Sequence, residues 1–369
     1  MELDVKKTQT IQFNGKKASQ VDFWANIKQF LRRLLLSEYF VLYLSIIYFV
    51  VLWPVVPRIA SAQNLGNIFS NMWPLLAVAI GQTFVLIIAG IDLSQPSIMA
   101  LVSVVGAVVI TTQVDPVLFE KSPLWGVLLT EQGGPLAGSV LSVPVAIIVM
   151  LLVGAMIGFF NGTSIARWKM PPFMVTLVSM MFFSAFAIYL TKSENIIHLP
   201  AAYKVIGQGQ ISFIPYSLFI VGGLAIVAHI ALSRTVFGRW LYAIGTNTRT
   251  AVVSGVPVTR VIILAYMLSG AFAAVGSVLY SARLEAGRPT LGATLLLDVI
   301  GATVIGGTSL FGGKGKIVWT VFGVLFFVLL DNSLNLLNLS YFTVMIVKGS
   351  VILLAALFDV TRTRILARS

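Results

Sequence analysis

Long apolar segments alternate with short polar ones along most of this chain. Ten of them approach the roughly 20 residues that a helix needs to cross about 30 Å of hydrocarbon. They are residues 38–57, 69–90, 95–113, 138–166, 171–191, 214–232, 259–281, 292–310, 317–333 and 341–359. Runs such as Leu75–Ile88 lack the alternation of a membrane β-barrel strand. The pattern predicts an all-α polytopic membrane protein with about ten transmembrane helices.

Composition and charge agree with this class and orient the chain. Hydrophobic residues make up 58% of the 369 and charged residues only 10%, which is unlike a soluble domain. Lysine and arginine accumulate in cytoplasmic loops. With the N-terminus inside, 18 of the 25 fall on the cytoplasmic side: Lys6, Lys7, Lys16, Lys17, Lys28, Arg32, Arg33, Arg167, Lys169, Arg234, Arg239, Arg249, Arg260, Lys314, Lys316, Arg362, Arg364 and Arg368. We therefore expect both termini to be cytoplasmic, and we attribute the net charge of +12 to topology and lipid contact rather than to nucleic acid.

The two terminal segments are predicted to be cytoplasmic tails on either side of one membrane domain. Residues 1–37 are polar and cationic, and the first apolar stretch is too long for a cleavable signal and has no small-residue cleavage site after it. Within this N-terminal tail, residues 23–36 have the spacing of an amphipathic interfacial helix. The transmembrane domain is expected over 38–360, and residues 361–369 form a cytoplasmic C-terminal tail.

The chain lacks most of the residue types and motifs that usually carry catalysis. It has no cysteine, and His198 and His229 lack metal-ligand spacing. The cluster Gly312–Lys316 does not have the spacing of a phosphate-binding loop. We predict neither a metal site nor an enzyme, and a membrane-embedded enzyme is the least favoured class. If ATP drives the protein, another chain must hydrolyse it.

Ionisable residues inside apolar spans are expensive to insert and are functional candidates by default. The candidates are Asp92, Asp298, Asp331 and Lys348. An ion pair between Asp331 and Lys348 would lower the cost of both, whereas a coupling-ion or proton relay is the functional alternative. Asn332 could line a polar pathway or cap a turn between helices.

Two segments interrupt the helical pattern, at residues 90–97 and 285–292, and both contain glycine and proline. Such breaks are tolerated in a membrane where the freed backbone groups are buried in protein or line a cavity. Five predicted spans separate the breaks, so the two halves would have opposite orientations. This spacing predicts an inverted repeat, although two ordinary interhelical turns would look similar.

The cytoplasmic stretch 233–258 is longer than a connection requires. Asn247 or Thr248 can cap a short helix that runs through Val253, and Gly255 can end it. A helix exposed in this way can dock into a groove on a partner. A plain surface turn is the alternative.

Several motifs resemble the membrane permease subunits of ABC importers of the ribose, xylose and galactose type. They are Gly90–Ser94, Asn161–Gly162, Pro171–Leu177, Ala243–Asn247 with Ser254–Gly255, and Gly306–Gly313. The resemblance covers about residues 65–359. It implies a bacterial cytoplasmic (inner) membrane location, a homodimer or heterodimer of permease subunits, a separate ATPase subunit that uses ATP, and a soluble extracytoplasmic solute-binding protein. It implies no cofactor in this chain.

The resemblance places ATPase coupling on the loop identified above. The residues concerned are Asn247, Thr248, Arg249, Thr250, Ala251, Ser254 and Gly255. We expect an alternating-access pathway for a monosaccharide or similar polyol, with hydrogen bonds to its hydroxyls. The expected pathway residues are Asp92, Ser94, Thr176, Asp298 and Asn332.

The chain departs from the family pattern at the first break. Gln95-Pro96-Ser97 stands where the family usually has Val-Gly-Ser, and Ala89 replaces a frequent glycine. Because proline fixes one backbone angle and lacks a donor, we expect the geometry of this break, and with it the detail of the solute contacts near Asp92, to differ from the family pattern. Two alternatives stay open: a nucleoside or branched-chain amino acid ABC permease, and an ion-coupled secondary carrier.

Overall fold

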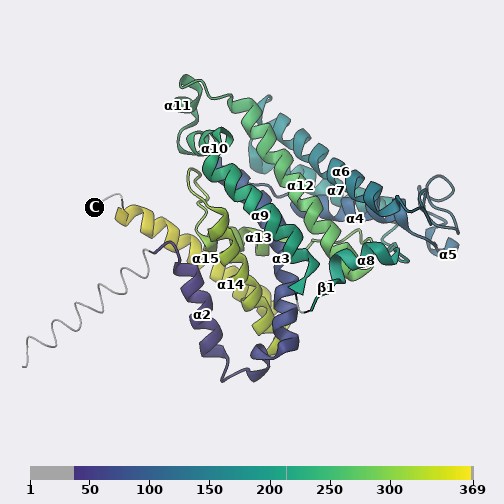
Figure 1. The fold of residues 1–369 in the computed structure, drawn as a ribbon. Coiled ribbons are helices and arrows are strands. Elements are labelled where there is room, and N and C mark those ends of the chain that lie inside the picture. Colours follow the sequence, from purple (N-terminus) through teal and green to yellow (C-terminus); the bar gives the residue numbers. More distant parts are fainter. Residues whose placement is uncertain (1–36, 213, 367–369) are drawn as a thin grey trace, which may run out of the picture.

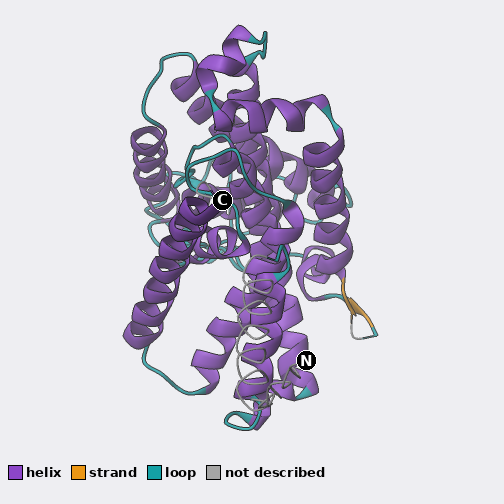
Figure 2. Ribbon diagram, turned by 90° about the vertical axis from the view of Figure 1, so that its left-hand side faces the viewer, coloured by secondary structure: helices purple, strands orange, loops and turns teal. Residues whose placement is uncertain are grey.

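The protein is almost entirely helical in a computed structural model that describes residues 37–212 and 214–366. The described part has one small antiparallel hairpin, β1 (Gln210–Ile211) with β2 (Ile214–Pro215), drawn in orange in Figure 2. The predicted amphipathic helix at 23–36 lies outside the described residues. The all-α fold class is confirmed.

Each of the ten predicted spans contains one helix. These are α2 (Phe40–Leu52), α3 (Ala62–Ile87), α4 (Gln95–Ile110), α6 (Ser142–Ala166), α7 (Pro172–Thr191), α9 (Tyr216–Arg234), α12 (Val258–Leu284), α13 (Leu295–Gly306), α14 (Ile317–Leu336) and α15 (Tyr341–Leu366). Among the described residues, six helices are long and apolar enough to cross a membrane, namely α3, α6, α7, α9, α12 and α14. The shorter apolar helices are α2, α4, α13 and the stretch Tyr341–Leu357 of α15.

The connections place short elements at opposite sides of the bundle. The 3-10 helix η1 (Pro57–Ala60), α5 (Pro116–Phe119) and α8 (Ala201–Gln208) lie on connections predicted to be external. The helices α10 (Val236–Thr246) and α11 (Thr248–Val253) lie on the connection predicted to be cytoplasmic. In Figure 1, α10 and α11 lie at the upper left with the end of α15 below them, whereas α5 and α8 lie at the right. The connections predicted to be external and the one predicted to be cytoplasmic thus lie at different ends of the bundle.

Local sequence signals explain where several helices begin. The Ser61 side chain accepts a hydrogen bond from the Asn64 backbone amide at the start of α3, and Thr235 does the same for Gly238 at the start of α10. Pro96 and Pro172 stand in the first turns of α4 and α7, where the missing backbone donor has no intrahelical partner to lose.

The helix α3 is the centre of the packing: most of its residues are buried, whereas most residues of α7 and α9 are not. It packs against α9, α12, α13 and α14. The crossing of α6 and α12 depends on small residues: a Cβ at Gly154 would lie 2.5 Å from the Gly270 carbonyl oxygen. Small residues allow close backbone approach where lipid supplies no hydrophobic driving force.

The two halves of the bundle repeat their contacts. The helix α4 packs against α6 and α7, and α13 packs against α14 and α15 in the same relation. Likewise α12 packs on α6 as α3 packs on α14. A non-glycine residue with a left-handed backbone stands at the start of each break: Ala89 (φ 60°) directly precedes the first, and Glu285 (φ 55°) is the first residue of the second. This packing supports the predicted inverted repeat.

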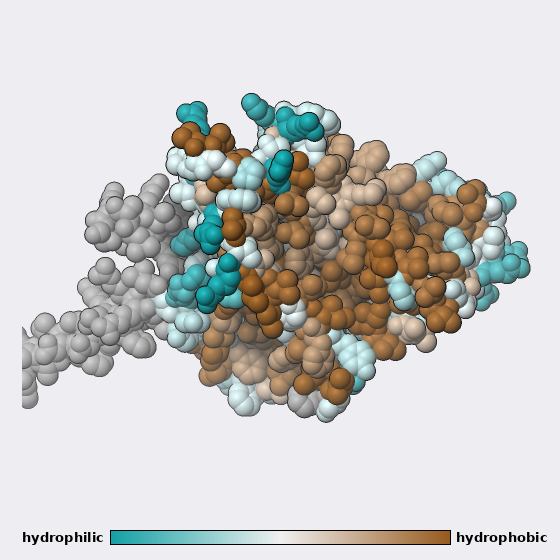
Figure 3. All heavy atoms as spheres, turned by 45° about the horizontal axis from the view of Figure 1, so that its top comes forward, coloured by the Kyte–Doolittle hydropathy of each residue, from teal (hydrophilic) through white to brown (hydrophobic). Residues whose placement is uncertain are grey.

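The surface is suited to lipid rather than to water. Figure 3 shows hydrophobic side chains over most of the visible face, with hydrophilic ones gathered toward its two ends. Exposed apolar side chains on the peripheral helices include Met181 on α7, Ile226 on α9 and Leu353 on α15. An apolar surface of this extent on a helical bundle is typical of a protein whose helices face hydrocarbon.

Candidate functional site

The first break forms a fully buried polar cluster around Asp92. The Asp92 carboxylate accepts hydrogen bonds from the Ser94 amide (3.0 Å), the Ser94 hydroxyl (2.5 Å) and the Ser269 hydroxyl on α12 (2.6 Å). Asp92 and Ser94 are each 0% exposed. A carboxylate out of contact with water requires such donors, so this cluster fixes the non-helical segment between α3 and α4 against α12.

The cluster continues to three more helices. Asn161 on α6 donates from its amide to the Ser94 hydroxyl (2.9 Å) and accepts from the Ser179 hydroxyl on α7. Gln95 donates to the Ser269 hydroxyl (2.9 Å) and to the Val78 carbonyl of α3 (3.1 Å). The departure from the family pattern at Gln95 therefore supplies a link between α3 and α12.

The predicted pathway residue Thr176 lies beside the same break. Its hydroxyl is within hydrogen-bond distance of the Ile91 carbonyl (3.2 Å) and of the Pro172 carbonyl one turn earlier on α7 (3.0 Å). The Tyr266 hydroxyl also reaches the Ile91 carbonyl (3.4 Å). The structure thus brings Asp92, Ser94 and Thr176 together, as groups that hold an unwound backbone.

Ala89 carries strain that glycine would remove. Its φ of 60° places an L-residue in the left-handed region, at a cost of about 1 kcal/mol or more. We expect Ala89→Gly to raise the free energy of unfolding by about 0.5–1 kcal/mol, after the larger unfolded-state entropy of glycine is allowed for. Thermal unfolding of the purified protein measures this. The same change at Ala79, inside α3, should destabilise, and an equal effect at both positions would contradict the account.

The second break is held by contacts with α4 and with the segment between α7 and α9. The Ser103 hydroxyl on α4 donates to the Arg288 carbonyl (2.8 Å), and Gly287 exchanges two backbone hydrogen bonds with Ile196. Lys204 pairs with Glu285 at 2.5 Å, and this hydrogen bond holds the pKa of Glu285 below its ordinary value. The break is therefore pinned by α4 and by the segment after α7.

A buried cation on α15 joins two carboxylates. The Lys348 ammonium lies 3.0 Å from Asp298 on α13 and 2.6 Å from Asp331 on α14, and its side chain is 8% exposed. The predicted Asp331–Lys348 pair is present, and Asp298 joins it. Since an unpaired charge inside a bilayer is expensive, this arrangement ties three helices together.

A polar cavity of about 200 Å³ adjoins this ion cluster. Asp298, Asp331 and Asn332 line it, together with Asn71 from the first half of α3 and Tyr280 from the last turns of α12. The Asn332 amide exchanges two hydrogen bonds with Asn64 (2.9 and 2.8 Å). Asn332 therefore reaches the cavity while also joining α14 to α3.

The five predicted pathway residues fall into two groups. Asp92, Ser94 and Thr176 surround the first break, whereas Asp298 and Asn332 line the cavity beside Lys348. Within residues 37–212 and 214–366, no hydrogen bond or ion pair joins the two groups. The assignment of these side chains to a solute pathway stays a prediction.

The predicted cytoplasmic helix is present as α11. The Asn247 side chain accepts from the Thr250 amide (3.0 Å) at its start, and Gly255 has a φ of 78° just after its end. Ala251 is buried, whereas Val252 and Val253 are exposed, the latter to 89%. Two exposed valines on a capped helix form a small apolar surface next to Arg249.

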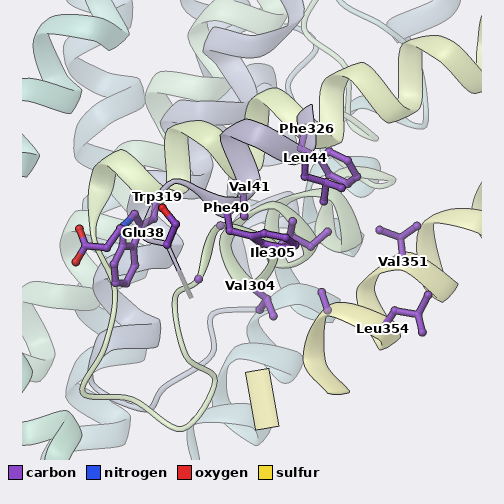
Figure 4. A pocket seen from close by; sticks show the side chains of 14 residues that line it. Glu38, Phe40, Val41, Leu44, Val304, Ile305, Trp319, Phe326, Val351 and Leu354 are labelled. Atoms are coloured by element: carbon purple, nitrogen blue, oxygen red, sulfur yellow. The ribbon is translucent and has the colours of Figure 1, made fainter. Parts of the chain in front are cut away.

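A further cavity, of about 320 Å³, lies between α2, α13, α14 and α15. Figure 4 shows Glu38 and Trp319 at one end and Leu44 and Phe326 at the other. The lining between them is mainly aliphatic and includes Val304 and Leu354. It offers few partners for the hydroxyls of a polar solute, and we do not assign it to the pathway.

Sequence reasoning missed several members of the polar clusters. Ser269 and Ser179 are two of several hydroxyl-bearing residues within the long apolar helices α12 and α7, and Asn64 lies near the start of α3. Isolated polar residues within apolar spans are the available signal. The pattern does not reveal which of them meet, because that depends on how five helices cross.

Comparisons with known proteins agree with the resemblance. The family model described as branched-chain amino acid transport system / permease component matches residues 64–356. The ribose import permease protein RbsC of Bacillus subtilis (strain 168) is 35% identical over 305 residues, which is 82% of this chain and 86% of the relative.

Two Escherichia coli (strain K12) proteins are also similar. Its ribose import permease protein RbsC is 33% identical over 307 residues, which is 82% of this chain and 87% of the relative. Its xylose transport system permease protein XylH is 31% identical, and the match covers 81% of this chain and 85% of the relative. No solved structure matches the chain significantly. The chain belongs to the branched-chain amino acid transport system / permease component family.

Proposed function

We propose that this chain is the membrane-spanning permease subunit of an ABC importer and that its solute is a monosaccharide or a similar polyol. The observation that carries the proposal is the identity of 31–35%, over more than four fifths of the chain, to ribose and xylose permeases. These relatives are transport permeases rather than enzymes. The chain is a multi-pass protein of the inner membrane, and the proposed orientation puts both termini in the cytoplasm.

The ATPase subunit docks on α11 in this proposal. The exposed Val252 and Val253 supply apolar contact, and Arg249 supplies a charge. The residues assigned to coupling are Asn247, Thr248, Arg249, Thr250, Ala251, Ser254 and Gly255. Ala251 packs inward, so its role is to seat the helix rather than to touch the partner.

Solute crosses by alternating access in a pair of permease subunits. A soluble binding protein delivers the solute on the outer side, and closure of the ATPase subunits moves α11. The two breaks supply the places at which helices can reorient without a bend inside a regular helix. The polar cluster at Asp92 and the cavity beside Asp298 contain carboxylates, amides and hydroxyls, which hydrogen-bond to polyols.

The rival functions have less support. Both carboxylates near α15 are paired with Lys348, an arrangement that joins three helices without a coupling ion. This structural role weakens the main argument for an ion-coupled carrier. The family description mentions branched-chain amino acids, but the similar proteins named above are sugar permeases, which favours a sugar over a nucleoside or an amino acid.

A docking test uses two glycines with nearly equal backbone angles. Gly255 has a φ of 78° and its amide donates to the Val252 carbonyl (3.0 Å). Gly126, on the predicted outer side, has a φ of 75° and donates to Leu129 (2.9 Å). Proline at either site removes the donor and forces a φ near −65°. We expect Gly255→Pro to reduce ATPase co-purification at least tenfold and Gly126→Pro to leave it unchanged.

The measurement is a pull-down of the tagged chain from solubilised native membranes, with partners identified by mass. Equal recovery of the ATPase with both variants would remove the docking role of α11. Failure to recover any ATPase with the unaltered chain, from membranes that still transport, would contradict the ABC permease proposal itself.

A further inference from the structure

A short turn, residues 309–315 between α13 and α14, touches both the docking region and the first break. The Gly313 amide donates to the carbonyl of Ile87, the last residue of α3 (2.8 Å). On its other side, the Tyr242 hydroxyl of α10 donates to the Gly315 carbonyl (2.6 Å). The turn therefore lies between α10 and the end of α3, and hydrogen bonds join it to both.

These three segments meet at backbone distance. A Cβ on Gly245 of α10 would overlap the Ile87 carbonyl and would lie 2.5 Å from the Gly313 nitrogen. A Cβ on Gly312 would lie 2.7 Å from the Ala89 Cβ. At these points backbone meets backbone with little room for an intervening side chain, so a displacement of one segment is expected to displace the others.

The turn itself is internally braced. The Ser309 amide donates to the Lys314 carbonyl (3.0 Å), which closes the turn. The Ser309 hydroxyl accepts from the Phe311 amide (3.2 Å). A turn closed by a hydrogen bond across its base transmits a displacement better than an open loop, because fewer of its backbone torsions are free to change.

The far end of this chain of contacts is the polar cluster at the first break. Ile87 precedes Ala89, Gly90 and Ile91, and the Ile91 carbonyl lies within reach of the Thr176 and Tyr266 hydroxyls. Asp92 then bonds to α12 through Ser269. Only five positions separate Ile87 from Asp92, so we expect a displacement of Ile87 to be passed to α7 and α12 through these hydrogen bonds.

We propose that residues 309–315 form a bridge that carries the displacement of α10 and α11 to the Asp92 break, and that Tyr242 is the positioning residue that couples α10 to this bridge. The proposal rests on the proposed function, since it assigns a route to the motion that ATPase docking would start. Two-state movement of a rigid unit is the physical basis of such coupling. Burial raises the pKa of Tyr242. Its hydroxyl therefore stays protonated at physiological pH and can donate the hydrogen bond to Gly315.

The first test is Tyr242→Phe, which removes one hydroxyl and keeps the ring. We expect the ratio of solute transported to ATP hydrolysed, in proteoliposomes with the ATPase and the binding protein, to fall about fivefold, the factor that corresponds to one net hydrogen bond. Recovery of the ATPase with the chain should not change. Tyr43→Phe, on the exposed face of α2, is the matched control and should leave the ratio unchanged.

The second test restores the bridge covalently. The chain has no cysteine, and a Cβ on Gly313 would lie 2.9 Å from the Thr246 hydroxyl oxygen. We expect a disulfide between Thr246→Cys and Gly313→Cys, in the Tyr242→Phe background, to raise the transport ratio toward that of the unaltered chain, and a reductant to lower it again. The left-handed φ of 70° at Gly313 strains the oxidised and reduced forms alike, so their comparison isolates the link.

The outcomes separate the bridge from the docking proposal. A normal transport ratio in Tyr242→Phe, or no difference between oxidised and reduced forms of the triple variant, would overturn the bridge while ATPase recovery stays normal. Loss of ATPase recovery from the unaltered chain would instead overturn the proposed function.

Discussion

Lys348→Met is expected to destabilise the protein by about 3–5 kcal/mol, the cost of leaving a buried charge without its partner. Lys348 is the cation between Asp298 and Asp331, so its removal leaves the largely buried Asp298 carboxylate without a cation and close to a second carboxylate, Asp331, whose side chain is 42% exposed. The fraction of protein that elutes as a monodisperse peak after solubilisation, and its unfolding midpoint, measure the effect. Lys121→Met, at an exposed position of the outer loop, is the control and should change neither.

A rescue experiment distinguishes charge from packing. Replacing both carboxylates, as Asp298→Asn and Asp331→Asn, should recover most of the lost stability of Lys348→Met, because no uncompensated charge then remains. If the triple variant is as unstable as Lys348→Met alone, the methylene packing of Lys348 rather than its charge holds α13, α14 and α15 together. If the variant with all three substitutions still transports solute, the cluster is not needed as an ion relay.

Asp92→Ala is expected to cost about 3 kcal/mol and to abolish transport. The substitution leaves the donors of Ser94 and Ser269 without an acceptor, and each unsatisfied buried donor costs about 1–3 kcal/mol. Asp92→Asn should cost about 1 kcal/mol because one carbonyl oxygen still accepts from Ser94. Unfolding midpoints and uptake rates of the two variants measure the difference.

The control for Asp92 is Asp115→Ala. Asp115 caps the short helix α5 from an exposed position by accepting from the Val117 amide (2.9 Å), so its loss costs only about 1 kcal/mol. If Asp92→Ala and Asp92→Asn have equal effects on stability, the number of hydrogen bonds accepted by Asp92 is not what holds the break.

The sequence predicts the helices well because the bilayer imposes a length and a composition on each span. All ten predicted spans contain a helix, and the capped helix α11 ends before Gly255 as its turn residues indicate. The predicted contact between Asp331 and Lys348 is also present, since charges inside apolar helices must find partners.

The polar clusters are less predictable because they depend on helix crossings. Gln95 looks like a departure from a family motif in the sequence, but in the structure it links Val78 to Ser269 across two helices. The sequence marks Asn332 as a polar residue in an apolar span but does not reveal that its amide bonds to Asn64, 268 positions away. Periodicity predicts which face of a helix is polar and does not identify the residue opposite.

The most direct test of the account is uptake of labelled ribose or xylose by proteoliposomes that contain this chain, its co-purified ATPase and the soluble binding protein. We expect uptake that requires ATP, falls to background without the ATPase, and is insensitive to collapse of proton and sodium gradients. Sugar uptake by the chain alone, driven by an ion gradient and indifferent to ATP, would contradict it.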